Sequence, residues 1–472
     1  MKKLIFCFDG TWNRIDSPSP TNVARIAQAI SRVDRHDHAQ LIHYDEGVGT
    51  NSKWLKMPAG MFGWGLKDNI AEAYHFLVLN YEPGDDIYVF GFSRGAFSAR
   101  SFVGMVRNCG IVSRRALHQI GAAKNLYTSR KEDTRPDSDA ARQFRFEHCR
   151  ELCLPGDRQW RKDQYPNEDN EAPTDLNIRY VGIWDTVGAL GVPKHLNLFS
   201  RFRRKYRFHD TRLSSTVKRA RHAVAIDERR ATFEPTLWSN LDVLNAAEPE
   251  AKRYQQMLFP GNHGSVGGGG LVTGLSDAAL EWVMRGAMKE ELRFDVDEHS
   301  PLFELLPDHR AALFNVKDKY KNSFGDLLEA AGRLADRDFS NMETPEFHPL
   351  VIRRFHSNPA DLPEKQPYRP APLKQWYPLL RDSPVAADIQ VDEAALEKKG
   401  IWDNRALRPP DRVRSYEVQR GDTLSIIAEK EMAGAQDAAI LYLHNRSARI
   451  LFAPDELYAR MKIEIPVYGS DP

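Results

Sequence analysis

The sequence predicts an α/β fold with a mostly parallel central sheet. Short apolar runs alternate along the chain with segments of helical spacing, as expected when a helix forms each crossover between parallel strands. Polar or glycine-rich clusters follow several of these runs. Sites in open α/β sheets form at the carboxyl ends of the strands, so these clusters are the first candidates for a functional site.

The elements can be assigned in chain order. Apolar runs predict strands over Leu4–Phe8, Leu41–Tyr44, Ile87–Phe90, Ile178–Trp184 and His222–Ile226. Helical spacing predicts helices over Asn22–Val33, with Thr21 or Asn22 as cap, and over Leu66–Tyr81. Residues 112–175 are polar, charged and rich in turn formers, which indicates an insertion in the sheet domain.

Composition excludes several classes of protein. The chain has 472 residues, enough for more than one domain, and a net charge of +1, which gives no basic field for nucleic acid. Four cysteines without zinc-ligand spacing favour a reducing compartment, and no motif indicates a metal or other cofactor. The apolar run after Met1 is too short for a signal peptide, and no run reaches the length of a membrane span. We therefore expect synthesis in the cytoplasm without a general secretory signal.

The most informative motif is Gly91-Phe92-Ser93-Arg94-Gly95, directly after the strand Ile87–Phe90 and before a helical segment. Strand, tight turn and helix are the context of a nucleophile elbow, in which Ser93 would be the nucleophile. Gly91 and Gly95 fit this interpretation, because a Cβ at either position would meet the neighbouring strand or helix.

A serine nucleophile needs a base and an acid, and α/β-hydrolases supply them in the chain order Ser, Asp or Glu, His. Asp185 is the preferred acid because it follows the strand Ile178–Trp184, and Asp227 is the rival acid. His263, in a glycine-rich loop mobile enough to reach Ser93, is the preferred base. His222 and His209 compete for that role.

Backbone N–H groups should hold the oxyanion that forms during such a reaction. Arg94, directly after the nucleophile, and Gly10 and Thr11, after the first strand, are the candidates. We expect Asp9 to brace this loop and to take no part in the chemistry. The basic and apolar stretch 194–208 is either a cap that touches anionic lipid or a solvated loop.

Several blocks together resemble the type VI lipase effector hydrolases. They are Phe8–Asn13, Thr21–Val23, Gly47–Thr50, Gly91–Arg100, Val181–Gly188, His222–Arg230, Phe259–Gly269 and Leu275–Asp277, with echoes up to residue 374. The resemblance implies an α/β-hydrolase fold, a Ser93-Asp185-His263 triad and phospholipase A-type hydrolysis of a lipid ester. It also implies a membrane-attacking effector with type VI secretion components and an immunity protein as partners. One departure is Ser265, where relatives often carry Asp.

The C-terminal part has a different character. Composition shifts to Pro, Lys and Glu over 359–372, and a compact unit begins near Tyr416. Gly421-Asp422-Thr423-Leu424, Asn445 and Ile463–Pro466 resemble a LysM module, which implies binding of peptidoglycan or another N-acetylglucosamine glycan through Gly421, Asp422, Thr423 and Asn445. The spacing over 446–461 departs from that module. We predict a hydrolase domain over 1–374, a linker over 375–411 and a LysM-like βααβ domain over 412–468.

Two other functions fit the same sequence. The enzyme could act on an ester outside membranes, such as a small cellular ester or a cell-wall acyl group. Alternatively, the hydrolase fold could be catalytically idle, and the protein could bind glycan or assemble with partners. Labelling of Ser93 by a fluorophosphonate separates the idle fold from both enzymes.

Overall fold

The structure is a computed structural model of the whole chain. It describes residues 1–10, 13, 15–34, 36–47, 62–129, 131–166, 173–188, 212–295, 305–313, 335–342, 344–383, 410–419, 422–432, 441–442, 444–445, 450 and 460–467, and of these only the backbone for 62–68, 232, 250 and 425. Of the predicted features, Thr11, the stretch 194–208, His209 and Gly421 lie outside these residues.

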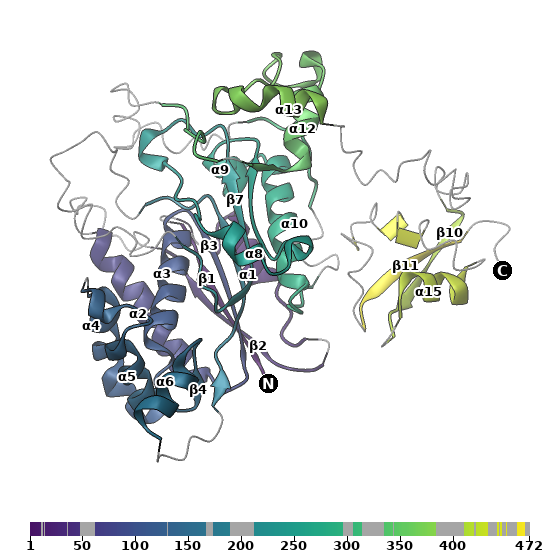
Figure 1. The fold of residues 1–472 in the computed structure, drawn as a ribbon. Helices are drawn as coiled ribbons and strands as arrows, with labels where there is room; N and C mark the ends of the chain where they lie inside the picture. The colour runs from purple at the N-terminus through teal and green to yellow at the C-terminus, as the bar shows by residue number, and fades with distance from the viewer. Residues whose placement is uncertain are drawn as a thin grey trace.

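Within the described residues, the fold centres on a seven-stranded sheet in which each strand runs parallel to its neighbours (Figure 1). Its order is β2-β1-β3-β6-β7-β8-β9. The strands are β1 (Lys3–Phe8), β2 (Gln40–Asp45), β3 (Asp86–Phe92), β6 (Ile178–Trp184), β7 (Val217–Ala225), β8 (Tyr254–Phe259) and β9 (Glu346–Phe347). The predicted α/β class with a mostly parallel sheet is therefore confirmed.

Helices cover both faces of the sheet (Figure 1). On one face, α2 (Phe62–Asn80) and α3 (Arg94–Cys109) pack against Leu4, Phe6 and Phe8 of β1. On the other face, α1 (Asn22–Ala29) and α10 (Gly274–Met288) pack against Ile5 and Cys7. Successive strand residues point to opposite faces, so each strand contributes to both cores.

In the central sheet, β7 starts earlier than predicted, and β8 and β9 were not predicted. β7 begins at Val217, five residues before the predicted start. The prediction missed its first part because Lys218, Arg219 and Arg221 interrupt the apolar pattern. Arg219 is accommodated by an ion pair, with its Nε 2.9 Å from Glu290 Oε1. β8 was not predicted, since its first residues, Tyr254, Gln255 and Gln256, are not an apolar run.

The predicted insertion is a folded helical layer. It contains α4 (Ile120–Thr128), α5 (Asp139–His148) and α6 (Asp157–Gln164), with the short strands β4 (Leu152–Cys153) and β5 (Thr174–Asp175). A buried ion pair joins α5 to α6: Arg145 donates from Nε and Nη2 to Asp157 Oδ2 and Oδ1 at 2.8 and 2.5 Å. The insertion is therefore ordered and contains paired charges in its interior, although its composition is polar.

The register between β3 and β6 contains one irregularity. Ile87 pairs with Ile178, but Tyr88 pairs with Tyr180, so Arg179 is an extra residue in β6. From there the pairing is regular up to Phe92 opposite Trp184. The residues that follow, Ser93 and Asp185, therefore leave the sheet side by side.

The C-terminal part begins with helical turns that belong to the sheet domain. α12 (Pro349–His356) and α13 (Tyr377–Asp382) pack together, and Leu380 lies in the same buried cluster as Val224 of β7. This packing extends past residue 374, into the segment predicted as linker. Beyond it, β10 (Arg412–Glu417) pairs antiparallel with β11 (Lys462–Val467), and α15 (Leu424–Glu431) follows β10.

In the part of the chain that the structure describes, none of the helices combines the length and the apolar character needed to cross a membrane. The longest described helix, α2, covers 19 residues and includes the charged residue Glu72.

Glycines let the start of α3 approach the end of β1. A Cβ on Gly95 would lie 2.1 Å from the carbonyl oxygen of Phe8 and 2.4 Å from that of Asp9. Backbone atoms at this depth cannot move aside easily, so we expect Gly95→Ala to destabilise the protein by about 2 kcal/mol and to lower its urea midpoint.

Gly121→Ala is the matched control, because Gly121 lies in α4 with nothing within 4 Å of its added Cβ. This change should stabilise the helix by about 0.5 kcal/mol. Equal midpoints for the two variants in urea unfolding would contradict the close approach at Gly95.

Candidate active site

Ser93 lies at a strained turn between β3 and α3. Its φ of 59° and ψ of −123° are unusual for a residue with a Cβ. A Cβ on Gly91 would lie 2.7 Å from Ala96 Cα, which explains glycine there as the sequence predicted. The Ser93 N–H donates to Trp184 O at 3.0 Å, which ties the turn to β6.

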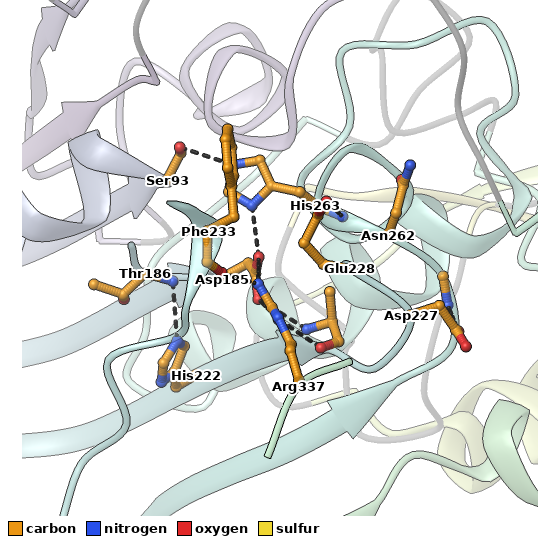
Figure 2. Close-up of polar contacts among 12 residues, drawn as sticks. Ser93, Asp185, Thr186, His222, Asp227, Glu228, Phe233, Asn262, His263 and Arg337 are labelled. Atoms are coloured by element: carbon orange, nitrogen blue, oxygen red, sulfur yellow. Dashed lines mark hydrogen bonds and ion pairs between the residues drawn. The ribbon is translucent and has the colours of Figure 1, made fainter. Parts of the chain in front are cut away.

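A continuous chain of hydrogen bonds joins Ser93, His263 and Asp185 (Figure 2). Ser93 Oγ is 2.7 Å from His263 Nε2, and His263 Nδ1 is 2.5 Å from Asp185 Oδ2. An ionised Asp185 can only accept, so Nδ1 carries the proton and Nε2 accepts from the hydroxyl. The three side chains are buried. Such an arrangement can move a proton from the hydroxyl to the imidazole.

His263 is more ordered than the predicted glycine-rich loop. It is the first residue of α9 (His263–Gly267), which Asn262 caps by accepting from the Ser265 N–H at 2.9 Å. Its ring lies between Phe92 and Phe233, with centroids 4.6 and 4.8 Å away. At His263 the glycine-rich segment is thus a capped helical turn that holds the imidazole within reach of Ser93, where the sequence had indicated a loop.

Charge and burial set the protonation of this group. Burial lowers the pKa of His263 below the usual value for histidine, and the hydrogen bond and charge of Asp185 oppose this shift. Burial alone would raise the pKa of Asp185, but the charge of Arg337 and hydrogen bonds from Arg337 and His263 hold it well below the usual range. Neutral histidine beside ionised aspartate is the expected state at neutral pH.

The rival acid is not in contact with His263. Asp227 Oδ2 instead accepts from the Gly261 N–H at 2.7 Å and from the Tyr368 hydroxyl at 2.9 Å. Burial raises the pKa of Asp227 to about 6. These bonds hold the turn before α9, which gives Asp227 a structural role.

The competing histidine that the structure describes also has another role. His222, on β7, accepts the Thr186 N–H at Nε2 over 3.3 Å, and its Nδ1 lies 3.0 Å from Gln256 Oε1. Burial lowers the pKa of His222 to about 3, so it stays neutral and supports the residue after Asp185.

The loop after β1 differs from the expectation for an oxyanion site. Asp9 accepts from Thr21 Oγ1 at 2.5 Å, Tyr44 OH at 2.6 Å and the Gly10 N–H at 2.6 Å. Asp9 thus braces the loop as expected, but the N–H of Gly10 is directed to its carboxylate. Arg94 is the first residue of α3, directly after Ser93.

Three contacts around the site were missed from the sequence. Glu228 Oε2 accepts the His263 N–H at 3.2 Å, Arg337 forms an ion pair with Asp185, and Phe233 covers the imidazole (Figure 2). Glu228 lies in the block His222–Arg230, directly after the rival acid Asp227, so its position in the sequence is a local signal. Arg337 is 152 residues from Asp185 and had no local signal.

Ser265 has a definite structural setting. Its hydroxyl lies 2.9 Å from Asn262 Oδ1 and 2.7 Å from Leu313 O, and both are acceptors. The hydroxyl can donate to one of them at a time, whereas an ionised aspartate could donate to neither. Serine here thus links α9 to the segment 305–313.

In the C-terminal unit, the described members of the predicted glycan site, Asp422, Thr423 and Asn445, make contacts within the fold. Asn445 is buried and bonds Leu441 O and both main-chain groups of Glu464. Asp422 accepts from Tyr416, Gln419 and Lys430, and Thr423 caps α15. Buried Asn445 is therefore a brace and not a surface contact for glycan.

Comparison with known proteins gives relatives of low identity. An uncharacterized protein of Saccharomyces cerevisiae, YEL023C, is 28% identical over 247 residues, which cover 49% of this chain and 32% of the yeast protein. The chain thus spans about a third of that relative.

Two solved structures are also similar. One is an uncharacterized protein from Pseudomonas aeruginosa, with 17% identity, coverage of 97% of this chain and 74% of that chain, and a TM-score of 0.36. The other is the Tle1 effector bound to the VgrG spike from the type 6 secretion system, with 18% identity, coverage of 57% and 51%, and a TM-score of 0.29. TM-scores this low do not establish a common fold over the whole chain.

A family model provides the decisive comparison. The catalytic domain of Tle1-like phospholipase effectors of the type VI secretion system matches residues 2–286, which hold Ser93, Asp185 and His263. Because this match covers more than half of the chain, the protein belongs to the Tle1-like phospholipase effector family.

Proposed function

We propose that the protein is a serine ester hydrolase of the α/β-hydrolase type, with Ser93 as nucleophile, His263 as base and Asp185 as the acid that orients it. The observation that carries this proposal is the unbroken hydrogen-bond chain from Ser93 Oγ through the imidazole to Asp185. The strained turn at Ser93, which presents the hydroxyl at the end of β3, supports it.

The proposed reaction has two halves. His263 Nε2 takes the Ser93 proton as Oγ attacks the ester carbonyl carbon, and it then gives that proton to the leaving alcohol. The acyl group remains on Ser93. In the second half His263 takes a proton from water, the resulting hydroxide attacks the acyl carbon, and Ser93 regains its proton as the acid departs.

The oxyanion of each tetrahedral intermediate needs donors near Ser93. We propose the Arg94 N–H and the loop after β1 as their source. Within that loop Thr11 is the better candidate, because the N–H of Gly10 donates to Asp9. Gly10 remains close enough to shape the site, since its added Cβ would lie 3.3 Å from Ser93 Cβ.

Membership of the effector family supports a phospholipid carboxylic ester as the substrate, with phospholipase A-type cleavage. It also supports export by type VI secretion to a target cell's periplasm, with secretion components and an immunity protein as partners. The C-terminal unit, with two paired strands and a capped helix between them in sequence, would hold the enzyme near peptidoglycan as a LysM-like module.

The first test is hydrolysis of phospholipid vesicles and of a soluble short-chain ester. Ser93→Ala should lower the rate on both at least about 10³-fold, since the nucleophile is lost. Ser98→Ala, a buried serine five residues along α3, is the matched control and should keep most activity.

Each other outcome has its own meaning. Turnover of the soluble ester alone would move the substrate away from membranes. Full activity in Ser93→Ala would refute the proposed nucleophile. Absence of turnover together with no fluorophosphonate labelling of Ser93 would favour the idle fold.

The pH dependence should follow His263. Its pKa is lowered by burial, and the base must be neutral to accept a proton. For a soluble neutral ester, kcat/KM should therefore fall on the acid side with a midpoint below about 6.5, the usual value for histidine. Enzyme held at each pH and assayed at pH 7 controls for unfolding, and a midpoint above about 7 would contradict this assignment.

Glycan binding can be tested on the full chain by cosedimentation with purified peptidoglycan. We expect binding that oligomers of N-acetylglucosamine displace. Glucose oligomers of equal length lack the N-acetyl groups and should not compete. No cosedimentation, or equal competition by both oligomers, would contradict the LysM-like assignment.

A further inference from the structure

The carboxylate of Asp185 pairs with a buried guanidinium in addition to the imidazole of His263. Arg337 donates from Nη1 to Oδ1 at 2.6 Å and from Nη2 to Oδ2 at 2.8 Å (Figure 2). Both side chains are almost fully buried. This two-point geometry fixes the plane of the carboxylate, which a single donor could not do.

The same guanidinium is anchored to two main-chain segments. Nη1 also donates to Ala225 O at 2.5 Å, at the end of β7, and Nη2 donates to Phe233 O at 2.7 Å. The Phe233 ring packs edge-on against the imidazole of His263 at 4.8 Å. Arg337 therefore holds the acid and also the residue that covers the base.

We infer that Arg337 is a positioning residue of this site: it orients Asp185 and Phe233 toward His263 and balances the negative charge of the acid. The inference rests on the proposed function, since it assigns Arg337 a part in ester hydrolysis. Arg337 lies outside residues 2–286, so a segment beyond the family's catalytic-domain match completes the site.

Charge balance gives the inference a measurable consequence. With Arg337 present, protonation of His263 adds a positive charge to a buried group whose carboxylate is already neutralised. Without Arg337, the same proton would neutralise a carboxylate that the guanidinium no longer compensates, so the pKa of His263 should rise. The fall of kcat/KM on the acid side of the pH profile, its acid limb, should therefore move to higher pH.

The other charged and titratable groups facing the site should not reverse this direction. Glu228 and Arg230 act on His263 but pair with each other at 2.8 Å. His222, which faces Asp185 and Arg100, is neutral at working pH. Arg337 is thus the charge paired directly with the acid.

The test compares Arg337→Gln with Arg337→Lys in the full chain, using kcat and KM for a soluble ester from pH 4.5 to 8.5. The neutral glutamine variant should lose about 10- to 100-fold in kcat and shift the acid limb upward by about one pH unit. Lysine keeps the positive charge but cannot donate to both carboxylate oxygens from two nitrogens. Arg337→Lys should therefore lower kcat about tenfold, while the position of the acid limb and KM stay unchanged.

Arg145→Gln is the matched control. Arg145 makes an equally buried two-point pair with Asp157, far along the chain from the proposed site residues. This variant should lose stability but keep the position of the acid limb. If Arg337→Gln lowers activity at every pH without moving the limb, as a purely structural residue would, the inference is overturned.

The remaining outcomes are also decisive. If the glutamine variant does not fold, Arg337→Lys decides alone, and a wild-type kcat in that variant overturns the inference. If the wild type neither hydrolyses esters nor reacts at Ser93 with a fluorophosphonate, both the proposed function and the inferred role of Arg337 are refuted. If the wild type is active and only the expected shift is missing, the proposed function stands and the role of Arg337 fails.

Discussion

The close contact between the start of α3 and the end of β1 is the constraint on which the site depends. Gly95 lies against the carbonyl oxygens of Phe8 and Asp9, and Gly91 lies against Ala96 in the same helix. The chain can therefore turn sharply at Ser93 and hold its strained backbone while α3 stays on the sheet. A strained backbone conformation persists only where the surrounding packing enforces it. Here the two buried cores, one on each face of the sheet, provide that packing.

Buried charge forms the next layer around this turn. Asp9 braces the loop after β1 through hydroxyl and amide donors, whereas Asp185 is matched by a guanidinium. Asp227 and Glu228, adjacent in sequence, hold the turn before α9 and the main chain of His263. Four acidic residues thus occupy one edge of the sheet in distinct environments. Burial raises the pKa values of Asp9 and Asp227, whereas the guanidinium partners of Asp185 and Glu228 hold the pKa values of these two acids below the usual range.

Much of this could be predicted from local patterns. The strand Ile178–Trp184 was predicted to the residue, and Ser93, Asp185 and His263 were selected because each follows a predicted strand or lies in a glycine-rich block. The prediction failed where long-range contacts decide. The first three residues of β8 are not an apolar run and join the sheet by pairing with β7, and α9 begins where Asn262 caps it. Arg337 reaches Asp185 only through the tertiary fold.

The extra residue in β6 also determines which residues at the ends of β3 and β6 lie side by side at the site. If Arg179 paired with Tyr88 and were not an extra residue, the ladder would place Ser93 opposite Trp184, and Asp185 would leave the sheet one position later. One strand residue corresponds to about 3.3 Å and to a side chain on the opposite face. The bulge lies at the end of the two strands that is farthest from the Ser93 hydroxyl. It nevertheless sets the alignment of Ser93 with Asp185, because the pairing is regular from the bulge to the ends of both strands.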